Sequence, residues 1–267
     1  MIDTPNWIDF AGGTLRLAPG RIARLQLNQP DKHNALSLAM WKAFPEALAT
    51  VEADRSIRVL IVEGAGGKAF SAGADISEFE AVYATPESTA RYGDAVRTAQ
   101  ARLRALPRPT IALLEGACVG GGCGIALACD LRFASTSARF GIPPARLGLA
   151  YSRADTAQLV EKVGPARAKD ILFSGRLLDA AEALAIRLIE RVCEPDLVRT
   201  QTLAYAETIA GLSQRSLLIA KTVINALADG GTQDDAGLDA LVASAFDGDD
   251  FREGYRAFLE KRKPDFG

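Results

Sequence analysis

Short runs of apolar residues divide the first two-thirds of the chain into predicted strands. Residues 22–27 alternate apolar and polar positions, which is typical of a strand with one buried face. Residues 57–62 and 110–114 are rich in Ile, Val and Leu and predict strands buried on both faces. A further apolar run at residues 131–134 predicts another strand.

Helical patterns lie between these strands. Residues 37–51 predict one helix, which Pro45 is expected to kink or divide. Thr85 followed by Pro86 predicts the start of a second helix, because threonine is a favoured N-cap and proline fits the first helical position. Apolar residues then recur at helical spacing as far as Leu106. The alternation of strands with helices favours an α/β fold.

After about residue 195 the strand signals become few. Three helical patterns follow, at residues 197–212, 216–228 and 238–262. Paired glycines at 230–231 separate the second pattern from the third, and an acidic turn at 247–250 interrupts the third. We therefore expect an α/β core over residues 1–195 and a helical segment over residues 196–267 that packs onto this core.

Composition and charge exclude several classes of function. Of the 267 residues 48% are hydrophobic, and a net charge of −2 with scattered basic residues argues against a nucleic-acid partner. No apolar run approaches the ~18 residues of a membrane span. The first six residues lack the basic start and apolar stretch of a secretory signal. We therefore expect a cytoplasmic protein with no membrane partner.

Metal and triad chemistry are not expected. His33 is the only histidine, and the four cysteines form no Cys-x-x-Cys pair. Three of the cysteines lie in an apolar, glycine-rich region, where they are best interpreted as buried small hydrophobes in a reducing compartment. The sequence therefore predicts no metal site.

Three consecutive glycines, residues 120–122, precede a small apolar helix predicted over residues 125–129. Glycine lets a backbone come close to a ligand, and a helix N-terminus offers unpaired N–H groups at the positive end of its dipole. This combination suits a developing oxyanion, with tight packing of helix against strand as the alternative. A dinucleotide-binding fingerprint is excluded, because its last glycine would fall on Ile125 or Leu127.

Residues 70–76 (Phe-Ser-Ala-Gly-Ala-Asp-Ile) add a second motif. They follow a predicted strand and a glycine-rich loop, and they precede the glycine run by one long helix and one strand. Together with residues 28–36 and 258–263, this arrangement resembles the enoyl-CoA hydratase/isomerase (crotonase) superfamily over nearly the whole chain. The resemblance implies a crotonase-like spiral of β-β-α turns. It also implies a C-terminal helical segment that builds a homotrimer or a dimer of trimers.

The resemblance also implies roles for individual residues. The backbone N–H groups of Ala74 and Gly121 would form an oxyanion hole that polarises the carbonyl of an acyl-CoA thioester and stabilises its enolate. Coenzyme A would arrive as part of the substrate, and no other cofactor is implied. Six residues would contact it: Lys32, Ala35, Ala72, Asp75, Ile76 and Lys261. For the two lysines, solvated surface charge is the alternative interpretation.

Both glutamates of the family's hydratases are missing here. Their positions hold Gly124 and Pro144, neither of which has a proton to move. The family's proline- and glycine-rich loop is also changed, and we interpret it as a redesigned pocket, with drift in a surface loop as the alternative. The altered residues are Tyr151, Ser152, Ala154 and Asp155.

Tyr151 resembles a residue of the family's malonyl-type decarboxylases. Its hydroxyl would orient a substrate carboxylate, which Arg153 would attract. Asp155 would instead serve as a substitute base if burial raises its pKa. The pocket for the acyl group would be lined by Phe79, Gly124, Pro144 and Arg153, although Phe79 is equally plausible as a core residue.

Three functions follow from these residues. The first is decarboxylation of a malonyl-type acyl-CoA, because loss of CO2 delivers the enolate with little acid–base help. The second is hydration or isomerisation of an enoyl-CoA with Asp155, Glu78 or Tyr151 as substitute acid–base groups. The third is a non-catalytic acyl-CoA-binding protein, since a chain can lose its catalytic residues and keep its fold.

Overall fold

The computed structural model describes residues 6–232 and 235–267. The strands in this range are β1 (Ile8–Phe10), β2 (Leu15–Ala18), β3 (Ile22–Leu27), β4 (Val59–Gly64), β5 (Ala69–Ser71), β6 (Thr110–Leu114), β7 (Ala117–Val119), β8 (Leu131–Ser135), β9 (Arg139–Gly141), β10 (Leu178–Asp179) and β11 (Arg191–Cys193). The first five residues, on which the expectation of a cytoplasmic location partly depends, lie outside the described range.

The α-helices alternate with these strands and then continue alone to the end of the chain. They are α1 (Leu38–Ala53), α2 (Phe79–Val82), α3 (Pro86–Arg104), α4 (Gly121–Ala128), α5 (Arg153–Val163), α6 (Pro165–Ser174), α7 (Ala180–Ala185), α8 (Val198–Ala210), α9 (Gln214–Ala228), α10 (Ala236–Ala243) and α11 (Asp249–Leu259). The α/β fold that the alternating pattern predicts is confirmed.

Two sheets organise the core. The larger has the strand order β1-β2-β3-β4-β6-β8-β11 and is parallel from β3 onward, with β1 and β2 antiparallel at one edge. The smaller has the order β10-β9-β7-β5. Within it β5 and β7 pair in parallel, so their carboxyl ends lie at the same edge of the sheet. The two glycine motifs of the sequence follow these two ends.

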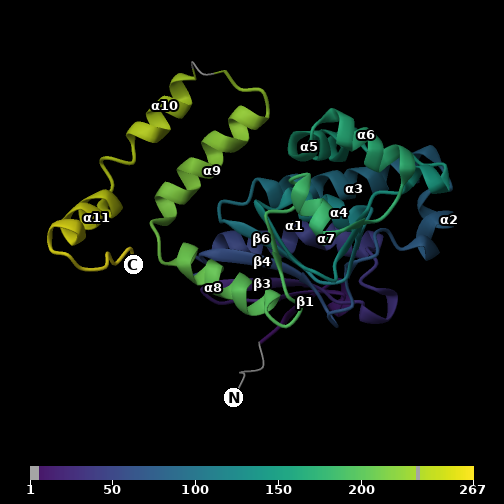
Figure 1. The fold of residues 1–267 in the computed structure, drawn as a ribbon, viewed down its shortest axis with the longest axis horizontal. Coiled ribbons are helices and arrows are strands. Elements are labelled where there is room, and N and C mark those ends of the chain that lie inside the picture. The colour runs from purple at the N-terminus through teal and green to yellow at the C-terminus, as the bar shows by residue number, and fades with distance from the viewer. Residues whose placement is uncertain (1–5, 233–234) are drawn as a thin grey trace.

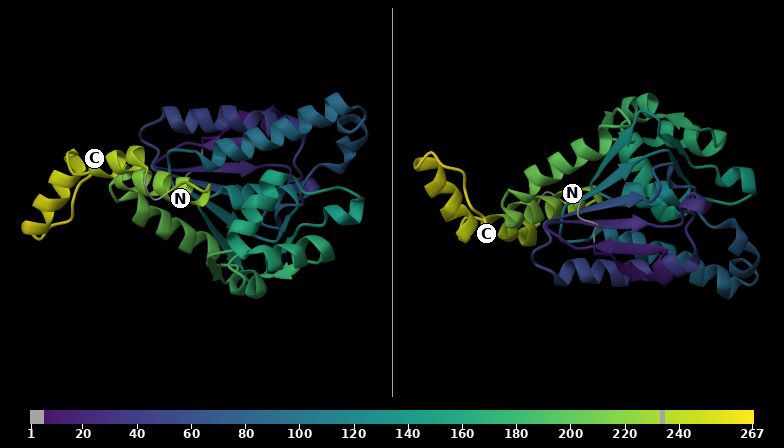
Figure 2. Two further views of the ribbon diagram at one scale, coloured as in Figure 1. Left: turned by 90° about the horizontal axis from the view of Figure 1, so that it is seen from above. Right: turned by 90° about the horizontal axis from the view of Figure 1, so that it is seen from below.

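The larger sheet is buried on both faces. In β4, Leu60 and Val62 belong to the main core, whereas Val59 and Ile61 pack with α8 on the other face. Figures 1 and 2 show α1, α3 and α4 on one side of this sheet and α8 on the other. This double burial explains why β4 and β6 are nearly continuous apolar runs in the sequence.

Most of the predicted elements are confirmed. The bounds of β3 and β6 agree with the pattern, and β4 begins at Val59, two residues later than predicted. Thr85 caps α3 in a reciprocal capping box with Ser88, and Pro86 occupies the first turn. The small helix after the glycines begins earlier than predicted, at Gly121.

Pro45 does not divide α1. A proline inside a helix costs about 3 kcal/mol through a lost hydrogen bond and a steric clash. The same helix buries Trp41, Phe44 and Leu48 almost completely, and each such side chain contributes roughly 1.5–3 kcal/mol. Packing therefore outweighs the local cost, which the sequence pattern alone does not weigh.

The last helices lead away from the core. α8 lies against the large sheet, α9 lies between the core and α10, and α10 and α11 form the far end of the molecule (Figure 1). Lys221 anchors α9 to the core, because its Nζ donates to Asp130 Oδ2 (2.9 Å) and to the Arg108 carbonyl (3.0 Å). The boundary at residue 195 stays a prediction. Among the described residues, no helix combines the length and apolar character needed to cross a membrane.

Candidate active site

Two glycine-containing loops meet at the ends of β5 and β7. Gly73 has a φ of +97°, and a Cβ on it would lie 2.9 Å from the Val119 carbonyl oxygen and 3.5 Å from the Gly121 nitrogen. Glycine permits both the positive φ and the close approach. The backbone at Ala74 therefore lies beside the first turn of α4.

Ala74 and Gly121 both present unpaired backbone N–H groups. On either side of Ala74 the backbone is paired, because Leu36 N donates to Gly73 O (2.7 Å) and Asp75 N donates to Leu36 O (3.0 Å). In the described part of the chain, neither the Ala74 N–H nor the Gly121 N–H has an acceptor. Two free donors in neighbouring segments, one at the positive end of a helix, are what an oxyanion hole requires.

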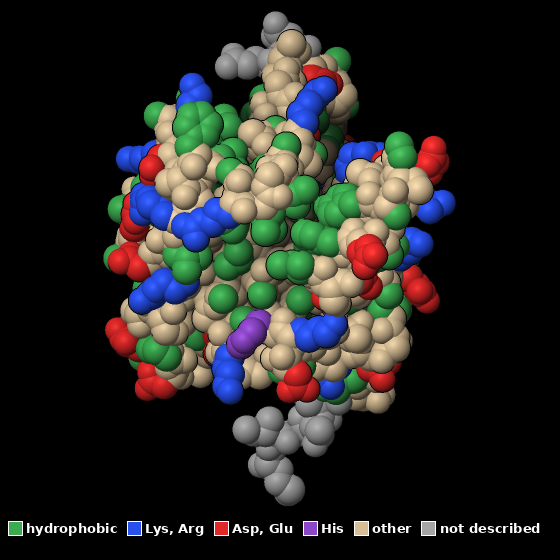
Figure 3. All heavy atoms as spheres, turned by 90° about the vertical axis from the view of Figure 1, so that its right-hand side faces the viewer, with side chains coloured by type: hydrophobic (Ala, Val, Ile, Leu, Met, Phe, Trp, Pro, Cys, Tyr) green, Lys and Arg blue, Asp and Glu red, His purple; other side chains and the backbone are tan. Residues whose placement is uncertain are grey.

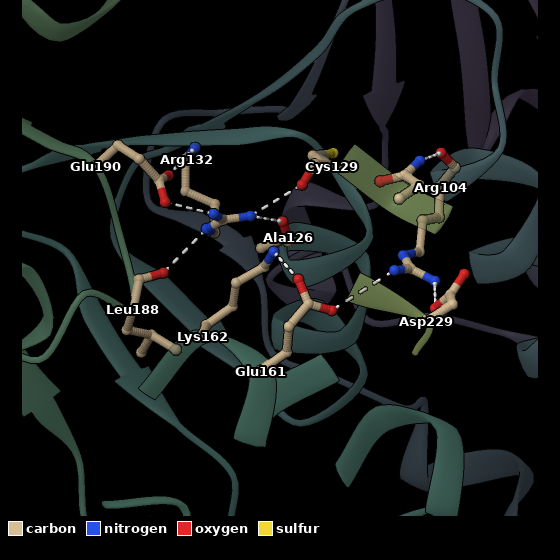
Figure 4. Close-up of polar contacts among 10 residues, drawn as sticks. Arg104, Ala126, Cys129, Arg132, Glu161, Lys162, Leu188, Glu190 and Asp229 are labelled. Atoms are coloured by element: carbon tan, nitrogen blue, oxygen red, sulfur yellow. Dashed lines mark hydrogen bonds and ion pairs between the residues drawn. The ribbon is translucent and has the colours of Figure 1, made fainter. Parts of the chain in front are cut away.

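α4 is held in place at both ends. Near its start, a Cβ on Gly122 would lie 2.8 Å from the Ser71 Cβ, so glycine is needed for the helix to approach β5. At its other end Arg132, which is 2% exposed, donates to the Cys129 carbonyl (2.9 Å) and pairs with Glu190 (Figure 4). A cation at the C-terminus of a helix complements the helix dipole.

The space beside Gly124 is filled by other side chains. A Cβ on Gly124 would lie 2.8 Å from Asp155 Oδ1 and would overlap Gln100 Nε2. Gly124 follows Gly121 by three residues, almost one turn of α4. The Asp155 carboxyl therefore lies beside the helix turn that presents one of the two free N–H groups.

Asp155 is buried, and one of its oxygens has no partner. It is 5% exposed, its Oδ2 accepts from Ser152 Oγ (2.5 Å), and its Oδ1 has no donor among the described residues. Burial raises the pKa of Asp155, while Ser152 and Gln100 oppose the rise. Gln100 Nε2 faces the carboxyl outside hydrogen-bonding geometry and is itself unpaired. A carboxyl of this kind is suited to proton transfer.

Tyr151 brings a phenol to the same cluster. Its ring packs against the main core, and its buried hydroxyl has no partner within the described residues. Burial raises the pKa of Tyr151 well above its usual value, and the nearby Asp155 raises it further. The phenol therefore stays protonated at neutral pH, next to the Asp155 carboxyl.

Lys32 and Asp75 form an ion pair beside the Ala74 loop. Lys32 Nζ lies 2.7 Å from Asp75 Oδ2, and this contact, followed by hydrogen bonds from Ser77, lowers the pKa of Asp75. The Lys32 side chain is still 53% exposed, so its ammonium is accessible to an anion from solvent. The structure thus brings together two of the residues predicted to contact coenzyme A.

Other predicted residues surround this loop less tightly. Ala35 is buried, whereas Ala72 and Ile76 are exposed at the surface. Phe79 begins α2, where its partly buried ring packs against the core and edge-on to Tyr83. These placements fit both the binding and the packing interpretations.

Three predicted residues lie outside the cluster. Pro144 begins a short 3-10 helix and is partly exposed, and Arg153 is exposed at the start of α5. Lys261 follows Glu260, the C-cap of α11, at the opposite end of the molecule from α2 in Figure 1. A single chain therefore does not bring Lys261 to the loop that holds Lys32.

Two other carboxylates have structural partners. Glu78 Oε2 accepts from the Leu38 N–H (2.7 Å) at the start of α1, so it caps that helix. Asp130 Oδ2 accepts from the Thr110 N–H (2.8 Å) in addition to Lys221. Asp155 differs from both in that its unpaired oxygen is buried.

The face that carries α2 and α6 is hollowed and apolar at its centre (Figure 3). Hydrophobic side chains line the hollow, and His33, the chain's only histidine, lies at its rim beside basic side chains. His33 also borders a cavity of about 220 Å³ between residues 30–34 and 65–69. An apolar hollow with a basic rim suits a ligand that is apolar at one end and anionic at the other.

Sequence reasoning does not identify Gln100 or the capping role of Ser152. Ser152 Oγ accepts from the Asp155 N–H (3.0 Å) and caps α5, which the Ser-x-x-Asp spacing could have indicated. Gln100 is 3% exposed on α3, between the buried Ala99 and Leu103. In the sequence, the signal for Gln100 was a polar residue within an apolar helical face.

Comparisons with known proteins agree with this geometry. Residues 18–267 match the sequence profile described as Enoyl-CoA hydratase/isomerase. The chain is 34% identical to the short-chain-enoyl-CoA hydratase of Clostridium acetobutylicum, over 91% of this chain and 93% of that protein. It is 32% identical to the crotonyl-CoA hydratase of Syntrophomonas wolfei, over 92% and 94%.

A solved structure shares the fold closely. The crystal structure of an enoyl-CoA hydratase/carnithine racemase from Magnetospirillum magneticum superposes with a TM-score of 0.92 at 40% identity, covering 95% of each chain. The match of fold and sequence spans almost the whole length. The chain therefore belongs to the enoyl-CoA hydratase/isomerase family.

Proposed function

We propose that this protein is an acyl-CoA enzyme that moves a proton at the carbon next to the thioester carbonyl. Asp155 is the acid–base group, and the N–H groups of Ala74 and Gly121 hold the carbonyl oxygen as it gains negative charge. The observation that carries the proposal is the buried Asp155 carboxyl in the space left by Gly124. The names of the relatives point to enoyl thioesters as the substrate class.

A single carboxyl suits migration of a carbon–carbon double bond. Asp155 would take a proton from the α carbon of a 3-enoyl thioester, and the two N–H groups would stabilise the resulting dienolate. The same carboxyl would then return the proton to the γ carbon. Each N–H donor contributes on the order of 3 kcal/mol in the transition state, and a positioned base contributes roughly 10²- to 10⁴-fold in rate.

Coenzyme A is proposed to lie along the Lys32 side of the loop. The exposed ammonium of Lys32 and the adjacent cavity at residues 30–34 and 65–69 support this orientation. The apolar hollow would then receive the acyl chain (Figure 3).

Decarboxylation of a malonyl-type acyl-CoA is the second candidate. The unpaired Tyr151 hydroxyl favours it, because a phenol can orient a substrate carboxylate. In this reaction CO2 leaves with its bonding electrons remaining on the α carbon, so Asp155 is not needed for the first step.

A thioester panel separates these functions. Wild type, Asp155→Asn and Tyr151→Phe are compared on 3-enoyl-CoA, on crotonyl-CoA and on malonyl-, methylmalonyl- and ethylmalonyl-CoA. Double-bond migration and hydration are followed by the ultraviolet absorbance of the conjugated thioester, and decarboxylation by CO2 release. Exchange of α hydrogens in D2O, read by mass spectrometry, reports enolate formation directly.

We expect the wild type to isomerise 3-enoyl-CoA and to exchange α hydrogens, and Asp155→Asn to lose both by at least about 100-fold. Rapid hydration of crotonyl-CoA that depends on Asp155 would show that the reaction is hydration and not isomerisation. CO2 release that survives in Asp155→Asn and fails in Tyr151→Phe would establish decarboxylation. Binding of coenzyme A without hydrogen exchange or turnover would show that the protein is a non-catalytic acyl-CoA-binding protein.

A further inference from the structure

Gln100 is a buried polar residue with no structural partner for its amide nitrogen. It lies on α3, is 3% exposed, and its Nε2 has no acceptor among the described residues. An unpaired buried amide costs roughly 1–3 kcal/mol, so a residue with only a packing role would be expected to be apolar. Its position therefore needs another explanation.

The amide and the Asp155 carboxyl converge on one point. Both Gln100 Nε2 and Asp155 Oδ1 crowd the place where a side chain on Gly124 would begin. Both atoms are unpaired, one as a donor and the other as an acceptor. The three residues come from three helices, since α3 and α5 each pack against α4.

A second contact keeps α3 and α5 in register. Arg104 lies four residues after Gln100, so the two share a face of α3. Arg104 Nη2 lies 3.6 Å from Glu161 Oε2 on α5, and Arg104 Nη1 lies 2.6 Å from Asp229 Oδ1 after α9 (Figure 4). This ion-pair cluster fixes the spacing of the helices that carry Gln100 and Asp155.

We propose that Gln100 is a positioning residue that orients the Asp155 carboxyl through its side-chain amide, in the space that Gly124 leaves open. This inference rests on the proposed role of Asp155 in proton transfer. A carboxylate offers only acceptors, so the N–H end of the amide is the end that suits it. Ser152 Oγ donates to Oδ2, and Gln100 Nε2 is the unpaired donor that lies toward Oδ1.

The amide also favours the charged form of the carboxyl. A donor directed at an ionised carboxylate lowers its pKa and thereby opposes the effect of burial. The other titratable groups near this cluster are Tyr151, which stays protonated, and the thiols of Cys123 on α4 and Cys118 on β7. From α3 the charged side chain directed toward α5 is Arg104, which is paired with Glu161.

Substitutions that keep the shape of Gln100 test the proposal. Gln100→Met removes the amide at similar length, and Gln100→Glu replaces the donor with a like charge. Gly93→Ala on the exposed side of the same helix is the control, because a Cβ there meets no other atom within 4 Å. Urea unfolding confirms that each variant is folded before it is assayed.

Two readouts are measured for each variant. The first is the titration of Asp155 by NMR with 13C-labelled aspartate, assigned by its loss in Asp155→Asn. The second is the pH profile of kcat and of kcat/KM for the thioester that the panel identifies. Titration of the free protein does not depend on which reaction the enzyme catalyses.

We expect the Asp155 titration and the acidic limb of the profile to move to higher pH in Gln100→Met and further in Gln100→Glu. At pH 7, kcat should fall roughly 10-fold in Gln100→Met with KM nearly unchanged, because the contact is to a charged group. An unmoved titration in both folded variants would overturn the proposal. A moved titration with a reaction that is indifferent to Asp155→Asn would uphold the positioning role and refute the proposed function.

Discussion

Gly124 is packed against two side chains, so adding even one methyl group there should be costly. Gly124→Ala would push its Cβ into Gln100 Nε2 and to 2.8 Å from Asp155 Oδ1, and both neighbours are buried. We expect a loss of about 2 kcal/mol in the free energy of unfolding, the usual cost of overpacking. Urea titration measures it through the midpoint at constant slope.

Gly93→Ala on α3 is the matched control for that measurement. Gly93 is exposed, and a Cβ there has open space. Alanine should therefore stabilise the protein by up to about 1 kcal/mol through helix propensity. If both substitutions stabilise the protein equally, the space beside Gly124 is not filled as described.

Asp155 should lower the stability of the folded protein at neutral pH. Because burial raises its pKa in the folded state, its favourable contribution is complete only below the unfolded pKa and is lost as pH rises through the folded pKa. Asp155→Asn should therefore raise the free energy of unfolding at pH 7, by about 1 kcal/mol as is common for stabilising changes in functional sites. The difference should shrink toward pH 4. An advantage that is independent of pH would contradict this account.

At the residue scale the sequence indicated the loops better than the side-chain cluster. The motifs at residues 70–76 and 120–122 lie where strands end, and the structure confirms that they meet. Asp155 was identified because a large side chain stands in a loop where small residues are usual. Gln100 was not, because it comes near Asp155 only when α3 and α5 both pack against α4, and its sole local signal was a polar residue in an apolar helical face.

Among the elements, α4 has a buried cation at its C-terminal end. Arg132 is buried at its C-terminal end, where it donates to backbone carbonyls and pairs with Glu190. Arg132→Ala should cost about 3 kcal/mol or more in the free energy of unfolding, because it leaves carbonyls and a carboxylate without their partner. Urea unfolding checks this value.

Arg97→Ala is the control for that substitution. Arg97 lies on α3 and pairs with Asp94 at the surface, where both side chains are 62% exposed. Exposed pairs contribute roughly 0–1 kcal/mol. Similar losses for the two arginines would show that Arg132 does not anchor α4.

The strands show which elements a sequence pattern can predict. β3, β4 and β6 have five or six residues each, long enough to show alternation or a continuous apolar run. β5, β7, β9 and β10 have only two or three residues, too few for either period to appear. These short strands form the small sheet, and their existence depends on pairing between distant segments. The sheet that places the candidate site was therefore absent from the prediction.

At the scale of the whole molecule, the C-terminal helices expose many large apolar side chains, and a gathering of such side chains marks an interaction surface. The exposed large hydrophobic side chains on and near α9, α10 and α11 are Leu212, Leu218, Ile224, Leu227, Val242, Phe246, Phe251, Tyr255, Phe258 and Leu259. These helices lie away from the core in Figure 1. A further copy of the chain is the partner we expect there, as a trimer or a dimer of trimers.

Such an assembly would also explain the position of Lys261. A single chain does not bring it to the predicted coenzyme A site, because α11 lies at the opposite end of the molecule from the face that carries His33 (Figures 1 and 3). An interface between copies could bring α11 of one chain to the loop of another. We therefore expect variants that disrupt assembly to bind coenzyme A more weakly, even though they leave Ala74 and Gly121 in place.

Phe258→Asp tests this expectation, because Phe258 is 81% exposed on α11 and a charge there opposes burial against another chain. Light scattering after size exclusion should show a trimer or hexamer for the wild type and smaller species for the variant, with calorimetric binding of coenzyme A reduced in parallel. Phe173→Asp, on α6 and 78% exposed, is the control and should leave the assembly intact. A monomeric wild type would refute the expected assembly. Dissociation caused by Phe173→Asp alone would place the interface on another face.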